Sequence, residues 1–269
     1  MSYSTFNHGD EFARSLSNNQ EHAVAAAPLT QTVPEVAAPI VVPADGLGGP
    51  RLLVEVETAN GTLPISLDPE LARAFLLAIV MAILRLLGLR SPKVLASDID
   101  AIAKGHLPPD VIAVIRTLVR GAVVGCAELS AERRDYAAGL LPASVGSIGS
   151  GATFRVTGIA ATDEGYDLAV MTADGEESTV CLTIPPHLRI EAVESVLALA
   201  VCIVTAHSNS EARSLIRDLA NGRTIGVVSR AVGFVIIGAL YTSPQLSKAH
   251  KNAFMGLPSV QRLVDRFAA

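Results

Sequence analysis

The chain has 269 residues, half of them apolar, with few aromatic residues, no tryptophan and a formal net charge of −5. This length can hold one large domain or two ordinary ones, and the acidic balance by itself argues only weakly against a dedicated nucleic-acid-binding protein. The three cysteines, Cys126, Cys181 and Cys202, stand far apart in apolar runs. This indicates buried thiols in a reducing compartment, and neither a disulfide framework nor a zinc site.

The first 49 residues differ in kind from the rest. They are rich in alanine, proline and valine, show no sustained helical or strand period, and contain prolines that would break a helix. We therefore predict a flexible, disordered arm over residues 1–49, either a solvated tail or a segment that reaches a neighbouring subunit. The start of the chain lacks a basic segment followed by an apolar one, so we expect a cytoplasmic protein that is not secreted.

A first structural repeat is predicted over residues 50–143. Two alternating apolar runs flank Asn60-Gly61, which is typical of a β-hairpin with a type I′ turn. Four helices should follow, because capping residues and prolines mark their starts and glycines mark several of their ends. Their expected ranges are about 69–90, 91–105, 108–126 and 130–139.

The same order of signals recurs later in the chain, which indicates an internal duplication. Residues 58–61 (TANG) align with residues 172–175 (TADG) at an offset of 114 residues. A three-residue insertion then shifts the offset to 117, which pairs proline 69 with 186, serine 91 with 208 and glycine 105 with 222. These matches fall at turns and caps, where the boundaries of elements are set.

The predicted fold is therefore α+β and mainly helical, with two copies of a hairpin plus about four helices related by a pseudo-twofold axis. The second repeat spans residues 167–269. Residues 144–166 form a connector that carries an extra strand in ATFRVTGIA.

The most apolar stretch, residues 71–90, raises the question of a membrane span. Its counterpart at residues 188–207 carries Glu191 and Glu194, and the longest uncharged apolar run in either is about a dozen residues. Spanning a bilayer takes ~20 residues. We therefore expect no membrane span, and interpret both stretches as the buried central helix of each repeat.

No motif indicates catalysis, and we predict no catalytic residue, no metal site and no cofactor. The strongest candidate, Asp98 with Asp100, has the spacing of a divalent-metal site. Both acids stand near an expected helix N-terminus, however, where carboxylates suit the helix dipole, and the second repeat has no acid there. A metal-dependent enzyme is therefore the third hypothesis, behind two non-enzymatic ones.

Basic residues gather in the helical segments. Residues 73–134 hold nine basic and five acidic residues, residues 196–269 hold eight and three, and residues 155–195 hold two and eight. Arginine, whose planar fork suits phosphate groups, outnumbers lysine seventeen to four. Solvated helix faces or coding bias would give the same pattern. If the arginines are functional, the residues predicted to contact a nucleic-acid backbone are Arg133, Arg134, Arg213, Arg217, Arg223, Arg230, His250 and Lys251.

The arm segment AVAAAPLTQTVPEVAAPIVVPADG, on an alanine- and serine-rich body of this size, resembles the proline-alanine-serine-rich proteins of fungal polymycoviruses. The resemblance is compositional and covers mainly the arm. It implies a protein that coats a double-stranded RNA genome without a conventional shell, in the host cytoplasm or in a virion.

The leading hypothesis is a non-enzymatic structural protein that associates with itself as a homo-oligomer, as a viral coat or a genome-associated protein that contacts RNA. A basic helical end that meets the acidic strand region of the next subunit would give such an assembly. The alternative is a soluble cytoplasmic binding module with a ligand or protein site between its two repeats, since clefts on a pseudo-twofold axis are natural binding sites.

Overall fold

The computed structural model describes residues 40–42, 51–58, 61–89, 91–146, 154–162, 165–172 and 175–268. Over these ranges the protein has nine helices and two three-stranded antiparallel sheets. The prediction of a mainly helical protein with small sheets is confirmed. Most of the predicted arm lies outside the described residues, and so does the turn at residues 59–60.

The first half begins with a sheet of strand order β1-β2-β3. Its strands are β1 (Ile40–Val42), β2 (Arg51–Thr58) and β3 (Gly61–Ser66). Thr58 pairs with Gly61 at the hairpin end, where Gly61 has a φ of +116° that suits glycine. Strand β1 was not predicted: the end of the expected arm pairs with β2 of its own chain.

Four helices follow, α2 (Pro69–Leu87), α3 (Pro92–Ala103), α4 (Pro109–Gly125) and α5 (Ala131–Leu140). Each begins within one residue of the predicted start. Ser91 and Ser130 make no side-chain capping hydrogen bond, but the cap of α2 and the first-turn prolines of α2, α3 and α4 are used as predicted. The carboxylate of Asp68, for example, accepts hydrogen bonds from the backbone N–H groups of Glu70 and Leu71 at the start of α2.

The second half has the sheet β4 (Phe154–Ala161), β5 (Gly165–Thr172) and β6 (Glu177–Thr183). Strand β4 is the predicted extra strand. Five helices follow, α6 (Pro186–Thr205), α7 (Asn209–Ala220), α8 (Gly226–Thr242), α9 (Lys248–Met255) and α10 (Pro258–Ala268). The fifth, α10, exceeds the predicted four, because the chain after Pro258 continues as an amphipathic helix with Val260 and Leu263 buried.

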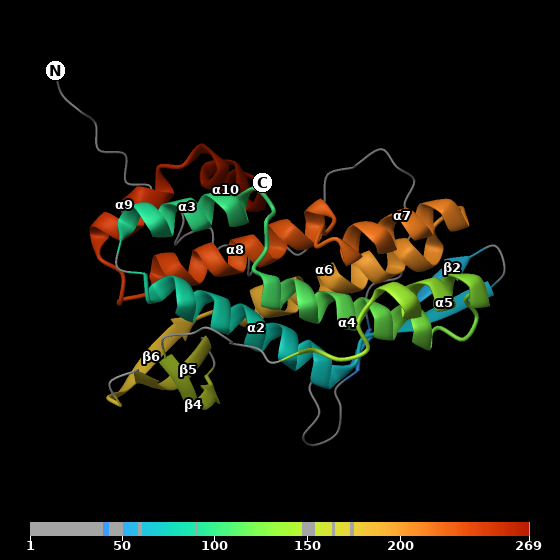
Figure 1. Cartoon of the computed structure of the whole chain (residues 1–269), viewed down its shortest axis with the longest axis horizontal. Helices are drawn as coiled ribbons and strands as arrows, with labels where there is room; N and C mark the ends of the chain where they lie inside the picture. The colour runs from blue at the N-terminus through green and yellow to red at the C-terminus, as the bar shows by residue number, and fades with distance from the viewer. Residues whose placement is uncertain are drawn as a thin grey trace.

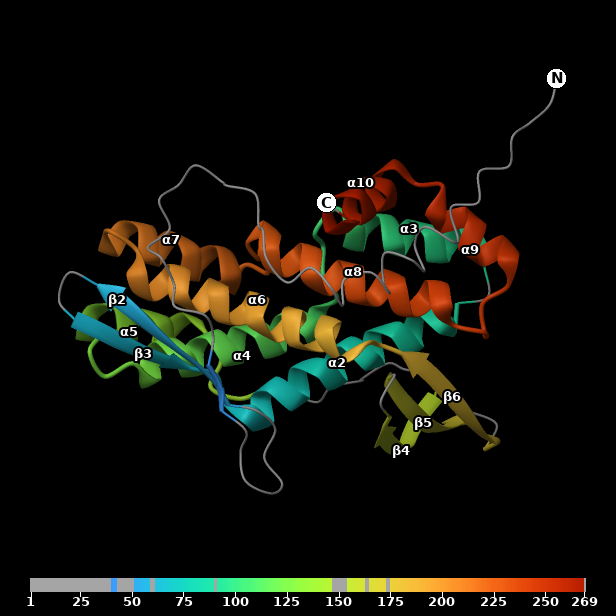
Figure 2. The same cartoon turned by 180° about the vertical axis from the view of Figure 1, so that it is seen from behind.

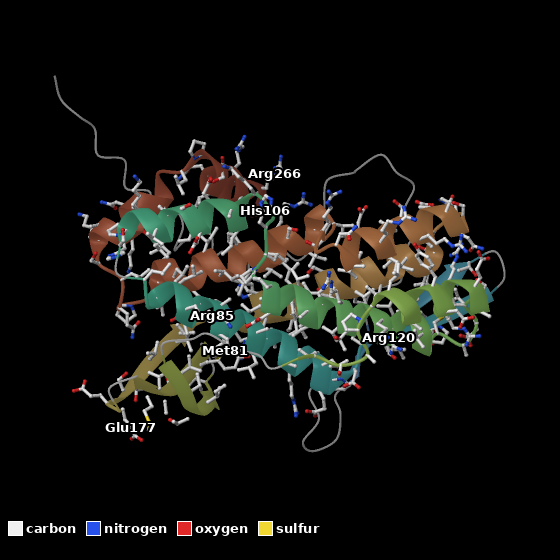
Figure 3. All side chains as sticks on the ribbon, in the orientation of Figure 1. Met81, Arg85, His106, Arg120, Glu177 and Arg266 are labelled. Carbon is white, nitrogen blue, oxygen red and sulfur yellow. The ribbon has the colours of Figure 1, made fainter. Side chains whose placement is uncertain are left out.

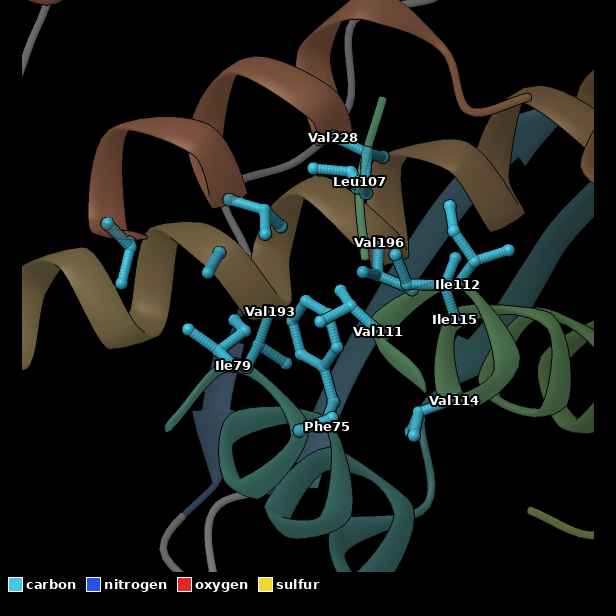
Figure 4. Packing of buried hydrophobic residues seen from close by; sticks show 14 of the residues in the cluster. Phe75, Ile79, Leu107, Val111, Ile112, Val114, Ile115, Val193, Val196 and Val228 are labelled. Atoms are coloured by element: carbon cyan, nitrogen blue, oxygen red, sulfur yellow. The ribbon is translucent and has the colours of Figure 1, made fainter. Parts of the chain in front are cut away.

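Four long helices, α2, α4, α6 and α8, form the centre of the molecule. Both α2 and α6 pack against α4 and against α8. Their side chains meet in one buried cluster that draws on both halves of the chain, and Figure 4 shows Phe75 of α2 among Val111 of α4 and Val193 of α6. Burial of a side chain of this size contributes roughly 1.5–3 kcal/mol, so this shared core fixes the two halves relative to each other.

Two helices of the first half lie against helices of the second half. Helix α3 packs against α9, α8 and α10, and α5 packs against α7. Figures 1 and 2 show α3 beside α9 and α10 at one end of the helical layer and α5 with α7 at the other. The halves are therefore interlocked and do not form two separate lobes.

The apolar stretch at residues 71–90 contains α2, most of which is buried in the core. Within the described ranges, no helix is long and apolar enough to cross a membrane. Helix α6, which covers most of the stretch predicted to be the counterpart of residues 71–90, carries Glu191 and Glu194 at half-buried positions. Burial raises the pKa of both carboxyls, and the neighbouring Glu194 adds to the rise at Glu191.

The prediction of three buried thiols is wrong for two of the cysteines. Cys126 is buried, whereas Cys181 and Cys202 are exposed. Cys181 precedes the buried Leu182 on β6, so strand alternation turns its side chain to the outer face of the sheet.

Candidate functional site

The structure does not bring the eight predicted basic residues together, but separates them into three places. Four lie where α5 packs against α7, two lie near the start of α8, and two lie on α9. In that order they are Arg133, Arg134, Arg213 and Arg217; Arg223 and Arg230; and His250 and Lys251.

Arg133 joins α5 to the end of α6. Its Nε donates to the side-chain oxygen of Asn209 at 2.7 Å, and its two terminal nitrogens donate to the carbonyls of Val204 and Ala206 at 2.9 and 2.7 Å. These carbonyls belong to the C-terminal end of α6, where the helix itself supplies no partners for them. The Arg133 guanidinium is thus occupied inside the protein.

The exposed arginines of α7 face acceptors and a ring on α5. Arg213 donates to Glu132 at 2.6 Å and lies over the ring of Tyr136, 5.2 Å from its centroid. Arg217 has a longer contact of 3.4 Å with the hydroxyl of Tyr136. The neighbouring Arg134 is half-buried, and its Nε has no hydrogen-bond partner among the described residues. This cluster holds two helices together more than it offers charge to a ligand.

On α9 the two predicted residues also have partners. The ring nitrogen Nδ1 of His250 lies 2.7 Å from the hydroxyl of Ser247. Lys251 lies over the ring of Tyr241 at 5.9 Å.

The last two predicted residues line a pocket. A cavity of about 500 Å³, here called the junction pocket, opens where the loop after α3 meets the loop between α7 and α8. A second cavity of about 210 Å³, the side cavity, shares part of its lining. Six basic residues and no acidic residue line the two: Lys104, His106, Arg223, Arg230, Arg262 and Arg266. Figure 3 shows His106 and Arg266 together at this place, across the helical layer from Glu177 of β6.

Two glycines shape the rim of the junction pocket. Gly105 and Gly222 follow two residues after the last residues of α3 and α7, and they have φ angles of +96° and +80° that favour glycine. The next residue after each, His106 or Arg223, donates its backbone N–H back into the helix at 2.9 or 2.8 Å. The two tight endings place both basic side chains at the pocket.

Each rim glycine also touches a helix of the other half. A Cβ placed on Gly105 would lie 3.5 Å from Ser229 of α8, and one placed on Gly222 would lie 4.0 Å from Ile112 of α4. The hydroxyl of Ser229 is shared with Thr224, and it lies 3.5 Å from the carbonyl of Gly105. The junction pocket is therefore built from both halves of the chain.

Acidic groups neutralise only part of the positive charge. Lys104 pairs with Asp100, and Arg223 pairs with Asp218 at 3.8 Å. The hydrogen bond from Lys104, with one from Ser259, lowers the pKa of Asp100. Among the described residues, Arg230 and Arg266 have no ion-pair partner.

Helix α8 presents its uncapped start to the junction pocket. Its first turn holds no acidic residue, and no side chain caps it. In the first half, Asp110 occupies the start of α4 and pairs with Arg85. The residue 117 positions after Asp110 is Val227, and the residue 117 positions after Arg85 is Cys202. The positive end of the α8 dipole therefore has no acidic side chain like Asp110 beside it. The Arg230 guanidinium folds back to lie 3.4 Å from the Cβ position of Gly226.

The prediction that Asp98 and Asp100 lie near a helix N-terminus is wrong, because both stand in the second half of α3 and its first turn holds no acid. Asp100 accepts hydrogen bonds from Lys104 and Ser259, which ties α3 to α10, and Asp98 is exposed. Within the part of the chain that the structure describes, no three side chains of metal-ligating type lie close enough together to hold an ion.

Sequence reasoning missed four basic residues of the two cavities, namely Lys104, His106, Arg262 and Arg266. A signal for two of them was present, since Lys104 and His106 flank one member of the aligned glycine pair. The aligned glycines, Gly105 and Gly222, predict where two helices end. The alignment does not predict that these two helix ends lie close together in the fold.

Comparisons with known proteins identify no relative, since no family model, curated protein or solved structure matches this chain.

Proposed function

We propose that the protein is a non-enzymatic binding protein that holds a phosphate-bearing anion in the junction pocket. The observation that carries the proposal is the lining of that pocket: five basic residues, no acidic residue, and two arginines, Arg230 and Arg266, without an ion-pair partner in the described part of the chain. Guanidinium groups bind phosphate through a planar fork of donors, so such a lining suits phosphate oxygens.

The lining of the junction pocket brings several positive side chains together. Two unit charges 4 Å apart interact by about 1 kcal/mol in water and about 4 kcal/mol at the effective dielectric of a protein surface. A bound anion reverses the sign of these interactions. Arg230 and Arg266, which line both cavities, gain most from it.

We further propose that the two halves are copies related by a pseudo-twofold axis that passes near the junction pocket. Helices α2 to α5 begin at residues 69, 92, 109 and 131, and α6 to α9 begin at 186, 209, 226 and 248, so each start differs by 117 residues (186 minus 69 for the first). The contact of α3 with α9 has its counterpart in the contact of α7 with α5. The reciprocal contacts of Gly105 and Gly222 support the same axis.

The backbone of RNA is the phosphate source that the sequence analysis favours. Two of the residues it named, Arg223 and Arg230, line the junction pocket. Self-association and genome coating remain predictions. The exposed large apolar side chains Val94, Leu140, Ile159, Ile190 and Val227 lie on five different elements, and they do not define one apolar face for assembly.

The test compares two double variants that lose the same charge. Arg230→Gln with Arg266→Gln removes the unpaired arginines of the pocket, and Arg213→Gln with Arg217→Gln removes the exposed arginines of α7. Binding is followed by calorimetry with tripolyphosphate and by anisotropy with a labelled oligouridylate of about 12 nucleotides. Thermal unfolding of each variant confirms that it is folded.

We expect the pocket variant to bind at least about tenfold more weakly than the wild type. Its log–log salt dependence should be shallower by about 0.7 for each phosphate group that the variant no longer neutralises. The α7 variant should bind within about twofold of the wild type, since surface charges at a distance are screened. The opposite ranking would move the site to α5 and α7, and an absence of binding to either probe would end the proposal.

A further inference from the structure

The junction pocket and the side cavity have a common wall. Lys104, Arg230 and Arg266 line both cavities. Beyond this wall, His106 and Arg223 line only the junction pocket, and Arg262 lines only the side cavity. Positive side chains therefore occur at three successive places: in the junction pocket, at the wall, and in the side cavity.

Neither lining suits a nucleobase. Base recognition without sequence preference rests on aromatic rings that stack on the base, and neither lining holds a phenylalanine, tyrosine or tryptophan. Apolar contact from the side chains is limited to Ala103 and Leu263, and the other lining residues are basic residues, glycines and hydroxyl-bearing residues. These groups match phosphate oxygens.

The size of the two cavities and the placement of their basic residues favour the same class of ligand. A single compact phosphate placed at the wall would leave Arg223, which lines only the junction pocket, and Arg262, which lines only the side cavity, without an anion beside them. A chain of linked phosphates would supply one anionic group to each of the three places. The two cavities together, about 500 Å³ and about 210 Å³, have room for such a chain.

We infer that the ligand is a chain of linked phosphate groups that runs from the junction pocket past the common wall into the side cavity, and that it is recognised by its charge and not by its bases. This inference rests on the proposed function. The shared chemistry has two sources, the phosphodiester backbone of single-stranded RNA and inorganic polyphosphate.

The experiment measures how affinity depends on chain length. Calorimetry on the full chain uses orthophosphate, pyrophosphate, tripolyphosphate and a longer polyphosphate, and anisotropy uses oligouridylate, oligoadenylate and an abasic oligonucleotide of equal length. Arg223→Gln reports on the junction pocket and Arg262→Gln on the side cavity. Arg217→Gln, on α7, is the matched control.

We expect affinity to rise by at least about tenfold from orthophosphate to tripolyphosphate, because each added phosphate reaches further cations. Arg223→Gln and Arg262→Gln should each weaken the longer chains by about three- to tenfold, while Arg217→Gln changes them by less than about twofold. The three oligonucleotides should bind within about threefold of one another. Their affinity relative to polyphosphate of equal charge then distinguishes the two sources.

Two results would overturn the inference while the proposed function survives. Orthophosphate that binds as tightly as tripolyphosphate, with Arg262→Gln silent, would mean a compact ligand confined to the junction pocket. A strong preference between oligouridylate and oligoadenylate would mean that bases are read. Failure of the proposed function itself is distinct, because then no phosphate probe would respond to the removal of Arg230 and Arg266.

Discussion

At the scale of single residues, arginines that look alike in the sequence have opposite roles in the structure. Arg133 has three hydrogen bonds inside the protein, two of them to the end of α6. Arg230 has no ion-pair partner among the described residues and faces a pocket. Arg133 therefore stabilises the fold, whereas Arg230 is one of the residues proposed to bind a ligand.

The role of Arg133 is testable by truncation. Arg133→Ala should lower the free energy of unfolding by about 2–3 kcal/mol, because the carbonyls at the end of α6 no longer receive hydrogen bonds from a charged donor. Arg217→Ala, with one long contact to Tyr136, should cost less than about 0.5 kcal/mol. Denaturant unfolding of both variants measures this, and an equally small effect of the two would contradict the structural role of Arg133.

The half-buried acids of α6 give a prediction about pH. Burial raises the pKa of Glu191 and Glu194 above the ordinary 4.5. The folded protein therefore holds these protons more tightly than the unfolded chain, and the stability they contribute falls as the pH rises through the interval above 4.5.

Glu191→Gln should therefore raise the free energy of unfolding at pH 7, by an amount on the order of 1 kcal/mol or less after allowance for solvent screening. Denaturant unfolding at pH 7 and pH 4 measures the gain, which should vanish at pH 4, where the native carboxyl is protonated. Glu177→Gln, at an exposed position of β6, serves as the control. A gain at pH 7 that persists unchanged at pH 4 would show that the burial of charge is not its cause.

At the scale of elements, the helix ends carry most of the information. The prolines and capping residues that begin α2 to α5 can be recognised in the sequence, and the predicted starts agree with the structure within two residues. The strand β1 and the helix α10 were missed for physical reasons. Three residues are too short to show a period, and α10, which begins at Pro258, has no matching helix after α5 among the described residues from which the alignment could predict it.

The two rim glycines can be tested against a glycine in ordinary helix. Gly105→Ala and Gly222→Ala should each cost about 1–2 kcal/mol, since their positive φ angles strain any side chain. Gly121→Ala lies in α4 with open space around its Cβ and should instead stabilise by about 0.5–1 kcal/mol. Thermal melts rank the three, and a neutral Gly105→Ala would argue against the strained helix ending.

At the scale of the whole molecule, the sequence predicted the order of the elements but not which helices pack against each other. Capping and periodicity are local, whereas the packing of α3 on α9 and of α5 on α7 joins residues far apart in the chain. The charge count placed basic residues in the helical segments, yet only the packing decides which of them face one another. The sequence led to the alternative hypothesis of a site between two repeats, but it did not predict which residues line the junction pocket.

The interlocked halves predict the behaviour of a cleaved chain. A protease site placed within residues 147–153 allows cleavage between α5 and β4. We expect the two fragments to remain together in size-exclusion chromatography, because α3 and α5 bury their faces against the other half. Each fragment expressed alone should fail to fold cooperatively. Two separate, folded fragments would contradict the shared core.

Phosphate binding in the junction pocket is tested most directly by a pyrophosphate titration of the isotope-labelled full chain, in which amide chemical shifts are measured. Binding at the pocket predicts saturable shifts at the amides of Gly105, His106, Gly222, Arg223 and Gly226, which line it. The amides of α5 and α7 around Arg133 and Arg213 should not move. Shifts confined to α5 and α7, or none that saturate, would contradict the account.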